Sequence, residues 1–468
     1  MRLVHLVLLL AILATGCRTN DMGPPTPTAA GIHPAALRDE AAEADSCGTG
    51  AKNGLFAVAE SVRKEQKPAV IPPKKTVLYL SGGGAYGAYP AGVLVGWSEA
   101  GNRPVFDVVA GVSTGALVGM FAFVGPDYDS ELRRVYTTLS TRDIFRIHKS
   151  IRTILGESLA DNTPLTCLIR GIGTPEFIQR VATEHAKGRR LYVGTTELDG
   201  RRQVVWDMGA IASEGTAESR ELFVRVLLAS AAIPGFFPPV SIPIDVNGVR
   251  YQERHVDGAV TAAIFFRAPW VPLDKRNDPV ARSLYDSDLY ILIARKLYAD
   301  PEPVKPRALT IASTSVSALI YTQTRDELLK LYTASVFTGM NFKVSSIPVD
   351  YPLVTMSTQF EPAEMGKLFD EGRRLVLSGA AWRTTPPGLE PGEQLSIRGG
   401  STLTIDPKAP KLLPPNNIPS SRAGTPPRAG PSRVKRSLHQ SRSIRHFCHS
   451  PRLPGLNQFP SLPRSITQ

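Results

Sequence analysis

Apolar and polar positions alternate in blocks along the middle of this 468-residue chain, and the block lengths predict an α/β fold. Short apolar runs that are typical of buried strands occur at 74–80, 108–109, 190–196 and 289–294. Helical patterns are expected from about residue 88 and at 116–124, 221–232, 308–332 and 362–381. Strands that alternate with helices favour a layered fold with a central, mainly parallel sheet between helices. Asp199-Gly200 further predicts a hairpin between 190–196 and 203–206.

A serine stands in the turn between one predicted strand and the helix after it. Residues 111–115 read Gly-Val-Ser-Thr-Gly. Gly111 and Gly115 allow the backbone to pass closely through a sharp turn, which lifts the Ser113 hydroxyl onto an exposed tip. A strand, turn and helix with this spacing are typical of a nucleophile elbow, so Ser113 is the candidate nucleophile.

A glycine-rich loop precedes this elbow and follows the strand at 74–80. It reads Gly82-Gly83-Gly84-Ala85-Tyr86-Gly87. Exposed backbone amides at the start of a helix attract negative charge, so the loop suits a phosphate or an oxyanion. The glycines also fit the G-x-G-x-x-G pattern of a dinucleotide site, with Asp107 about 20 residues beyond. Asp107 precedes the next strand, whereas a ribose-binding acid ends it, and this disfavours the dinucleotide alternative.

A serine hydroxyl needs a base before it becomes a good nucleophile. Of the eight histidines, only His255 has a suggestive neighbourhood, because Asp257 and Gly258 follow it. The others lie in the N-terminal leader, in solvated or Pro/Ala-rich segments, or in the basic C-terminal tail. A single Asp-Gly pair is most often a plain turn, so the residues alone leave the base open.

Several motifs, in this order, make the chain resemble the patatin-like phospholipase (patatin-like lipid acyl hydrolase) family. They are the glycine loop 82–87, the elbow 111–115, the segment 229–239 (Ala-Ser-Ala-Ala-Ile-Pro-Gly-Phe-Phe-Pro-Pro) and Asp257-Gly258-Ala259. Residues 159–165 also resemble a family segment. The resemblance spans about 76–270, with an extension to about 385.

The resemblance implies a Ser-Asp dyad, with Ser113 as the nucleophile and Asp257 as the general base. It also implies an oxyanion hole made by the amides of Gly82, Gly83 and Gly84. Supporting roles in these motifs fall to Gly87, Gly111, Gly115 and Gly258. The family usually carries a basic residue where Tyr86 stands, so any charge-assisted role at that position is lost here.

The activity implied is that of a carboxylic ester hydrolase, which cleaves membrane lipids through an acyl-enzyme intermediate and needs no cofactor or metal. Asp257 becomes a better base if burial raises its pKa, and Ile233, Phe236 and Phe237 are expected to supply apolar surroundings. Phe265, Phe266 and Trp270 are expected to line an acyl-chain wall or to lie in the core. A catalytically inactive, envelope-anchored scaffold or lipid-binding protein with the same fold is the alternative.

Residues 1–17 have the form of a signal peptide, with one basic residue and an apolar run from Leu6 to Ala14 that is too short to span a membrane. Small residues directly before Cys17 resemble a bacterial lipoprotein box. This implies lipidation of Cys17 and a location in the bacterial cell envelope. Arg18 favours the outer membrane, since an aspartate there often marks inner-membrane retention. A secreted or periplasmic protein with an ordinary signal peptide is the alternative.

Composition divides the rest of the chain. Residues 18–73 are expected to be a flexible tether, 74–387 the catalytic domain (motifs at 76–270 and an extension at 271–387), and 388–468 a Pro/Ser/Arg-rich disordered tail. The net charge is +12, and ten of these charges lie in 411–468, which contains no Asp or Glu. The basic character therefore belongs to the tail, and membrane lipids, not nucleic acid, are the expected partners. Cys47, Cys167 and Cys448 are too widely spaced for a metal site, and neither a structural metal nor a disulfide framework is expected.

Overall fold

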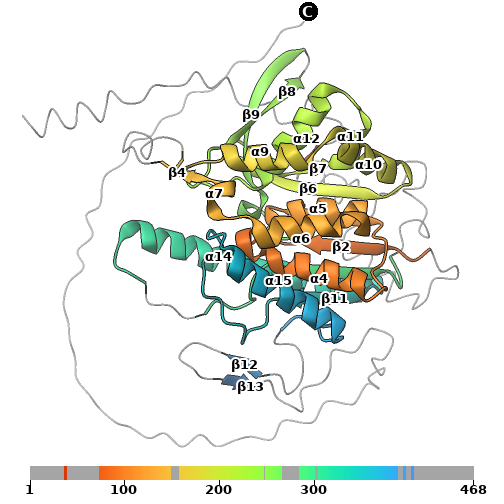
Figure 1. Ribbon diagram of the computed structural model, residues 1–468, viewed down its shortest axis with the longest axis vertical. Coiled ribbons are helices and arrows are strands. Elements are labelled where there is room, and N and C mark those ends of the chain that lie inside the picture. Colours follow the sequence, from red (N-terminus) through yellow and green to blue (C-terminus); the bar gives the residue numbers. More distant parts are fainter. Residues whose placement is uncertain are drawn as a thin grey trace, which may run out of the picture. The chain divides into compact units, whose positions relative to one another are not determined.

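The computed structural model describes residues 73–148, 158–246, 248–265, 284–300 and 304–387, together with the short segments 36–38, 394–396 and 402–404 (Figure 1). The predicted leader, Cys17, most of the tether and the basic tail lie outside the described residues, and so do Phe266, Trp270, Cys47 and Cys448. These predictions therefore remain predictions.

In the described part of the chain, nine strands form one mixed sheet (Figure 1). Its parallel strands lie in the order β6 (Arg190–Glu197), β3 (Val108–Val112), β2 (Thr76–Leu80), β10 (Asp288–Ile293) and β11 (Asn341–Ser346). Its antiparallel strands are β7 (Arg202–Asp207), β1 (Ala36–Arg38), β9 (Val249–Asp257) and β8 (Val240–Val246). Separate short pairs join β4 (Arg146–Ile147) to β5 (Ala160–Asp161) and β12 (Gln394–Ser396) to β13 (Thr402–Thr404).

Helices flank this sheet. The α-helices are α4 (Ala88–Glu99), α5 (Thr114–Val124), α6 (Asp129–Thr138), α7 (Thr141–Ile144), α9 (Thr163–Ile172), α10 (Pro175–Ala186), α11 (Met208–Ser213), α12 (Ala217–Ser230), α14 (Ala308–Thr338) and α15 (Pro362–Leu377). Short 3₁₀ turns are η1 (Gly84–Gly87), η2 (Pro126–Tyr128) and η3 (Gly258–Val260). None of the described helices is both long enough and apolar enough to cross a membrane.

Successive strand residues face opposite sides of the sheet and enter different apolar cores. On β2, Leu78 and Leu80 pack with the cluster formed by α4, α5, α6 and α15, whereas Val77 and Tyr79 pack with the cluster that includes the C-terminal half of α14. The layered α/β fold with mostly parallel central strands is therefore confirmed.

The predicted strands at 74–80, 190–196 and 289–294 and the hairpin at Asp199-Gly200 are confirmed, with ends shifted by a few residues at most. The helix expected at 221–232 begins earlier, after Thr216, whose hydroxyl accepts a hydrogen bond from the Ser219 amide at 3.0 Å. A turn does follow Asp257, because its carboxylate caps the 3₁₀ turn η3 by accepting a hydrogen bond from the Ala259 amide. Asp257 ends the nine-residue strand β9, which pairs with β8, and the alternation along these strands was not recognised.

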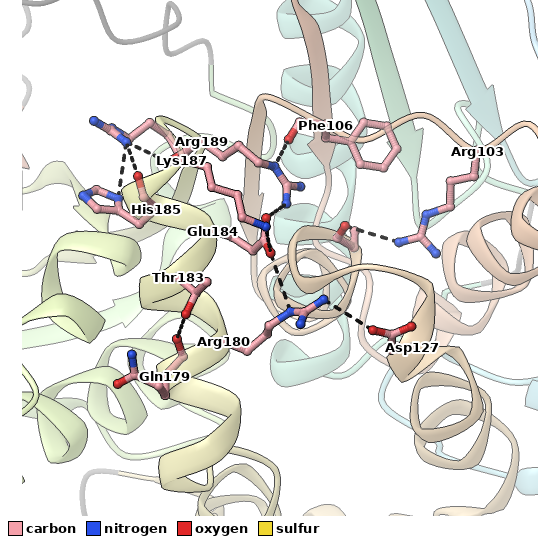
Figure 2. A network of polar contacts seen from close by, with 12 residues as sticks. Arg103, Phe106, Asp127, Gln179, Arg180, Thr183, Glu184, His185, Lys187 and Arg189 are labelled. Carbon is pink, nitrogen blue, oxygen red and sulfur yellow. Dashed lines mark hydrogen bonds and ion pairs between the residues drawn. The ribbon is translucent and has the colours of Figure 1, made fainter.

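An ion-pair network joins the end of α10 to the start of β6 (Figure 2). The Glu184 carboxylate lies 2.8 Å from both Lys187 Nζ and Arg189 Nη1, and Arg180 Nε lies 3.6 Å from it. Burial alone would raise the pKa of Glu184, but hydrogen bonds from Lys187 and Arg189 outweigh it and lower the pKa. Arg189 also donates to the Phe106 carbonyl, so the network fixes the entry of β6 into the sheet.

Replacing Glu184 by glutamine is expected to lower the free energy of unfolding by about 2 kcal/mol, because the nearly buried Arg189 guanidinium loses its carboxylate. Chemical denaturation followed by circular dichroism measures this change. Glu131→Gln is the matched control, because it breaks an exposed ion pair within α6 and should cost less than about 0.5 kcal/mol. Equal losses in the two variants would contradict the prediction.

Candidate active site

Strand β6 changes its partner along one edge, and this change brings the predicted dyad together. Val112, the last residue of β3, pairs with Gly194 of β6, and Asp257, the last residue of β9, pairs with the next residue, Thr195. The opposite edge of β6 is occupied by β7 from Tyr192 to Glu197. Because the chain leaves the sheet at Ser113 to begin α5, β9 can take over the vacated edge. The structure therefore places Ser113 and Asp257 at the same point of the sheet.

The backbone of Ser113 is in a conformation that suits an elbow. Its φ of 55° and ψ of −130° are unusual for a residue with a side chain, and such conformations cost about 1–3 kcal/mol. The Ser113 amide donates a hydrogen bond to Ser230 Oγ at 2.9 Å, and this hydroxyl donates to the Gly194 carbonyl at 2.7 Å. Ser230 is fully buried, so one side chain ties the strained elbow to β6.

The supporting glycines are needed because the elements of the site approach each other closely. A Cβ atom at Gly87 would overlap the Thr114 side chain, and one at Gly111 would overlap the Gly115 carbonyl. A Cβ atom at Gly115 would overlap the Leu80 and Ser81 carbonyls, and one at Gly258 would overlap the Gly194 carbonyl. The structure thus gives all of these predicted glycines a packing role around Ser113 and Asp257.

Burial sets the acidity of Asp257, whose exposed fraction is 5%. Desolvation raises the pKa of Asp257 to about 6, while the Ala259 amide, the Ser113 hydroxyl and the positive charge of Arg295 act in the opposite direction. The Ala259 amide donates to Asp257 Oδ1 at 2.8 Å. The carboxylate is thus ionised at neutral pH and is a stronger proton acceptor than an ordinary aspartate. The predicted burial of Asp257 is confirmed.

His255 is occupied elsewhere. Its ring is fully buried, with Nδ1 3.0 Å from Thr195 Oγ1 and Nε2 3.2 Å from Glu253 Oε2. The ring also packs edge-on against Trp206. Since both ring nitrogens have partners, neither is left to accept a proton from Ser113.

The glycine loop lies directly against Ser113, because a Cβ built on Gly82 would be 3.1 Å from Ser113 Cβ. The Gly82 carbonyl accepts hydrogen bonds from Ser81 Oγ at 3.0 Å and from Arg295 Nη2 at 3.1 Å. In a trans peptide the carbonyl and the following N–H point in opposite directions, so these bonds fix the direction of the Gly83 amide. Within the described residues, the amides of Gly82, Gly83 and Gly84 donate no hydrogen bond, and they remain able to bind an anion.

Tyr86, which departs from the family pattern, donates its hydroxyl to the Thr355 carbonyl at 2.5 Å. A cation nevertheless stands beside the loop, because Arg295 reaches it from the end of β10 and stacks over the Tyr321 ring. Arg295 Nε is buried and has no partner among the described residues. Neither Arg295 nor Ser230 was predicted from the sequence as a residue of this site. Ser230 had a signal in the 229–239 motif, whereas Arg295 had none.

Asp107 lies at the wrong end of the sheet for a dinucleotide site. Its carboxylate accepts a hydrogen bond from the Thr76 amide at 2.8 Å, at the first residue of β2, while the glycine loop follows the last residue of that strand. A five-residue strand separates the two by about 17 Å. The predicted dinucleotide alternative therefore has no support in the geometry.

An apolar pocket of about 630 Å³, which includes its open mouth, begins at Ser113 and Gly84. Its walls come from α5, α6, α9, the 231–237 segment and residues 357–365, and include Leu117, Val135, Phe145, Leu165, Phe236 and Phe360. Two family-like segments pair in this wall, since the Leu159 and Ala160 amides donate to the Gly235 and Phe236 carbonyls. Ile233, Phe236 and Phe237 thus line the pocket. Phe265 is buried in the opposite core and not in this wall.

In the part of the chain that the structure describes, no group of three or more His, Cys, Asp or Glu side chains is placed to hold a metal ion. Cys167, on α9, is an exposed free thiol.

Comparison with known proteins gives the following. Residues 78–270 match the family model described as patatin-like phospholipase. Among solved structures, VipD from Legionella pneumophila is similar with a TM-score of 0.33 and 13% sequence identity, over 66% of this chain and 67% of that chain. No curated protein matches the sequence significantly.

Ser230→Ala is expected to lower the free energy of unfolding by about 1–3 kcal/mol, because the Ser113 amide and the Gly194 carbonyl lose a buried partner. Ser113 should also react more slowly with a fluorophosphonate, since its backbone is no longer held. Denaturation curves and labelling rates measure the two effects. Ser378→Ala removes an exposed hydroxyl directly after α15 and should change neither quantity by a comparable amount. If Ser230→Ala behaves like this control, the hydrogen bonds of Ser230 to Ser113 and Gly194 do not stabilise the elbow.

Proposed function

We propose that this chain, in which residues 78–270 form a patatin-like phospholipase domain, hydrolyses carboxylic esters of membrane lipids with Ser113 as nucleophile and Asp257 as general base. The observation that carries the proposal is the shared edge of β6, where an elbow serine meets a buried carboxylate beside glycine amides that bind no other described residue. The family match supports the reaction class, and the geometry of these residues supports the roles.

The reaction proceeds in two steps, acylation of Ser113 and hydrolysis of the acyl-serine. Ser113 Oγ attacks the ester carbonyl carbon, its proton moves to Asp257, and the resulting oxyanion accepts hydrogen bonds from the amides of Gly82, Gly83 and Gly84. Asp257 then returns the proton to the departing alcohol, which leaves an acyl-serine. Water attacks this acyl group, gives its proton to Asp257, and the fatty acid is released as Ser113 regains the proton.

The apolar pocket supports an acyl chain as the part of the substrate next to Ser113. Its walls are almost entirely hydrocarbon, and a chain buried there gains about 0.8 kcal/mol for each methylene group removed from water. The open mouth leaves the other side of the ester facing the glycine loop and Arg295.

Ser113→Ala and Asp257→Asn are each expected to abolish fatty-acid release from a mixed-lipid panel, measured by mass spectrometry of the products. A fluorophosphonate should modify wild-type protein at Ser113 and leave Ser113→Ala unlabelled. His255→Gln is the matched control, because it changes the neighbouring buried residue on β9 and should keep the activity of the folded fraction. Folded wild-type protein that is neither labelled nor active would contradict the proposal and would favour the inactive scaffold or lipid-binding alternative.

The pH dependence of kcat/KM follows from the pKa of Asp257, which burial raises to about 6. A general base must be ionised, so the rate is expected to rise with pH through about 6 and to reach a plateau above about 7. Below the pKa, kcat/KM should fall about tenfold for each pH unit. A soluble short-chain ester, assayed between pH 4 and 8 over a range in which the protein stays folded, provides the measurement. A midpoint near the ordinary aspartate value of about 4 would exclude the desolvated base.

A further inference from the structure

The N-terminal half of α14 has an unusual surface. All nine residues from 311 to 319 are exposed, and the exposed fractions of Ile311, Val316 and Leu319 are 51%, 54% and 69%. Figure 1 shows this end of the helix extending away from the sheet and its covering helices. No charged residue occurs between 308 and 324. The C-terminal half is different, because Leu328 and Leu331 are buried against the sheet.

A helical segment that is exposed on all sides, such as this part of α14, gains little stability in water when it has no ion pairs and no buried face. The polar groups of this helix are partly satisfied internally, since the hydroxyls of Ser313 and Ser315 donate to the carbonyls of Thr310 and Ile311. Such a surface is better suited to an apolar or interfacial environment than to water.

The exposed half of α14 lies next to the elements of the active site. Immediately after it, Tyr321 stacks on Arg295, and Gln323 Nε2 donates to the Thr261 carbonyl at 2.6 Å, four residues beyond Asp257. Two other exposed apolar side chains adjoin the motifs of the active site. Val260, in the turn after Asp257, is 50% exposed. Met356 is 61% exposed, and its neighbour Ser357 accepts a hydrogen bond from the Ala85 amide of the glycine loop.

We propose that residues 311–319 of α14, with Val260 and Met356, form a docking surface for the headgroup region of a lipid bilayer. The flank of this surface is basic, because Lys305 and Arg307 are exposed and no acidic residue occurs between 304 and 325, so anionic headgroups complement it.

A lipid surface fits better than a second copy of the chain as the occupant, because this face borders the site. A second copy seated there would stand beside the route by which lipid reaches Ser113. The proposal rests on the proposed function for its choice of partner, but it requires no step of the chemistry.

The test measures binding of the full chain to vesicles made of equal parts of phosphatidylcholine and phosphatidylglycerol. The parent protein carries Ser113→Ala, which prevents hydrolysis of the vesicles, and Cys17→Ser, which prevents lipid attachment. Val316→Gln with Leu319→Gln should weaken binding about tenfold, because two apolar side chains are removed from the interface. Glutamine is a good helix former, and far-UV circular dichroism verifies that α14 is retained.

The matched control is Val105→Gln with Leu377→Gln. These side chains are 73% and 46% exposed, and they lie away from the site, before β3 and at the end of α15. The control should bind vesicles within about twofold of the parent. It retains the basic tail, so any attraction by the tail is the same in all proteins compared. Lys305→Gln with Arg307→Gln should weaken binding to these vesicles but not to pure phosphatidylcholine.

Equal vesicle binding by the α14 variant and the control would overturn the proposal. A parent protein that sediments as a dimer, with a monomeric α14 variant, would also overturn it and would assign the face to a second copy. A separate activity assay tests the proposed function. In protein that retains Ser113, the α14 variant should hydrolyse a soluble short-chain ester as fast as the control, and absence of that activity in both leaves the binding result intact.

Discussion

The whole site depends on one edge of strand β6, which β3 occupies up to Gly194 and β9 occupies from Thr195 onward. A sheet edge has room for one strand at a time, so β9 can enter only because the chain turns out of the sheet at Ser113. The exposed tip predicted for Ser113 is wrong, because only 6% of this residue is exposed, and the elbow does more than position its hydroxyl. It vacates the position that Asp257 then fills, and Ser230 fixes the junction by bonding to both Ser113 and Gly194.

This arrangement has a cost in stability. Ser113 is held at a positive φ, and desolvation raises the pKa of Asp257 from 3.8 to about 6. A carboxyl group whose pKa is higher in the folded state stabilises the fold below about pH 4, and that contribution is lost as the pH rises to about 6. The loss amounts to about 3 kcal/mol at neutral pH. Burial of the surrounding strands and helices must offset it.

The local parts of this site were predictable from sequence, and the long-range parts were not. The glycine loop and the elbow each lie within a few consecutive residues, and their glycines are dictated by close backbone approach, so a short pattern identifies them. Ser230 binds Ser113 at a separation of 117 residues and Arg295 binds Gly82 at a separation of 213, and nothing near either residue indicates which loop it will meet. The β8–β9 pairing is local but was also missed, for a different reason, because charged and polar residues of β9 obscure its alternation.

Helix α14 shows how a segment outside the motif region enters the site. Its C-terminal half is part of the core beneath the sheet, and the Glu327 carboxylate accepts a hydrogen bond from the Ile264 amide at 2.7 Å. Gln323 holds the Thr261 carbonyl one turn earlier, so the segment that follows Asp257 is clamped along the helix. A rigid helix transmits position along its length. The residues that hold the segment after Asp257 are therefore carried by the same helix whose residues 311–319 are exposed.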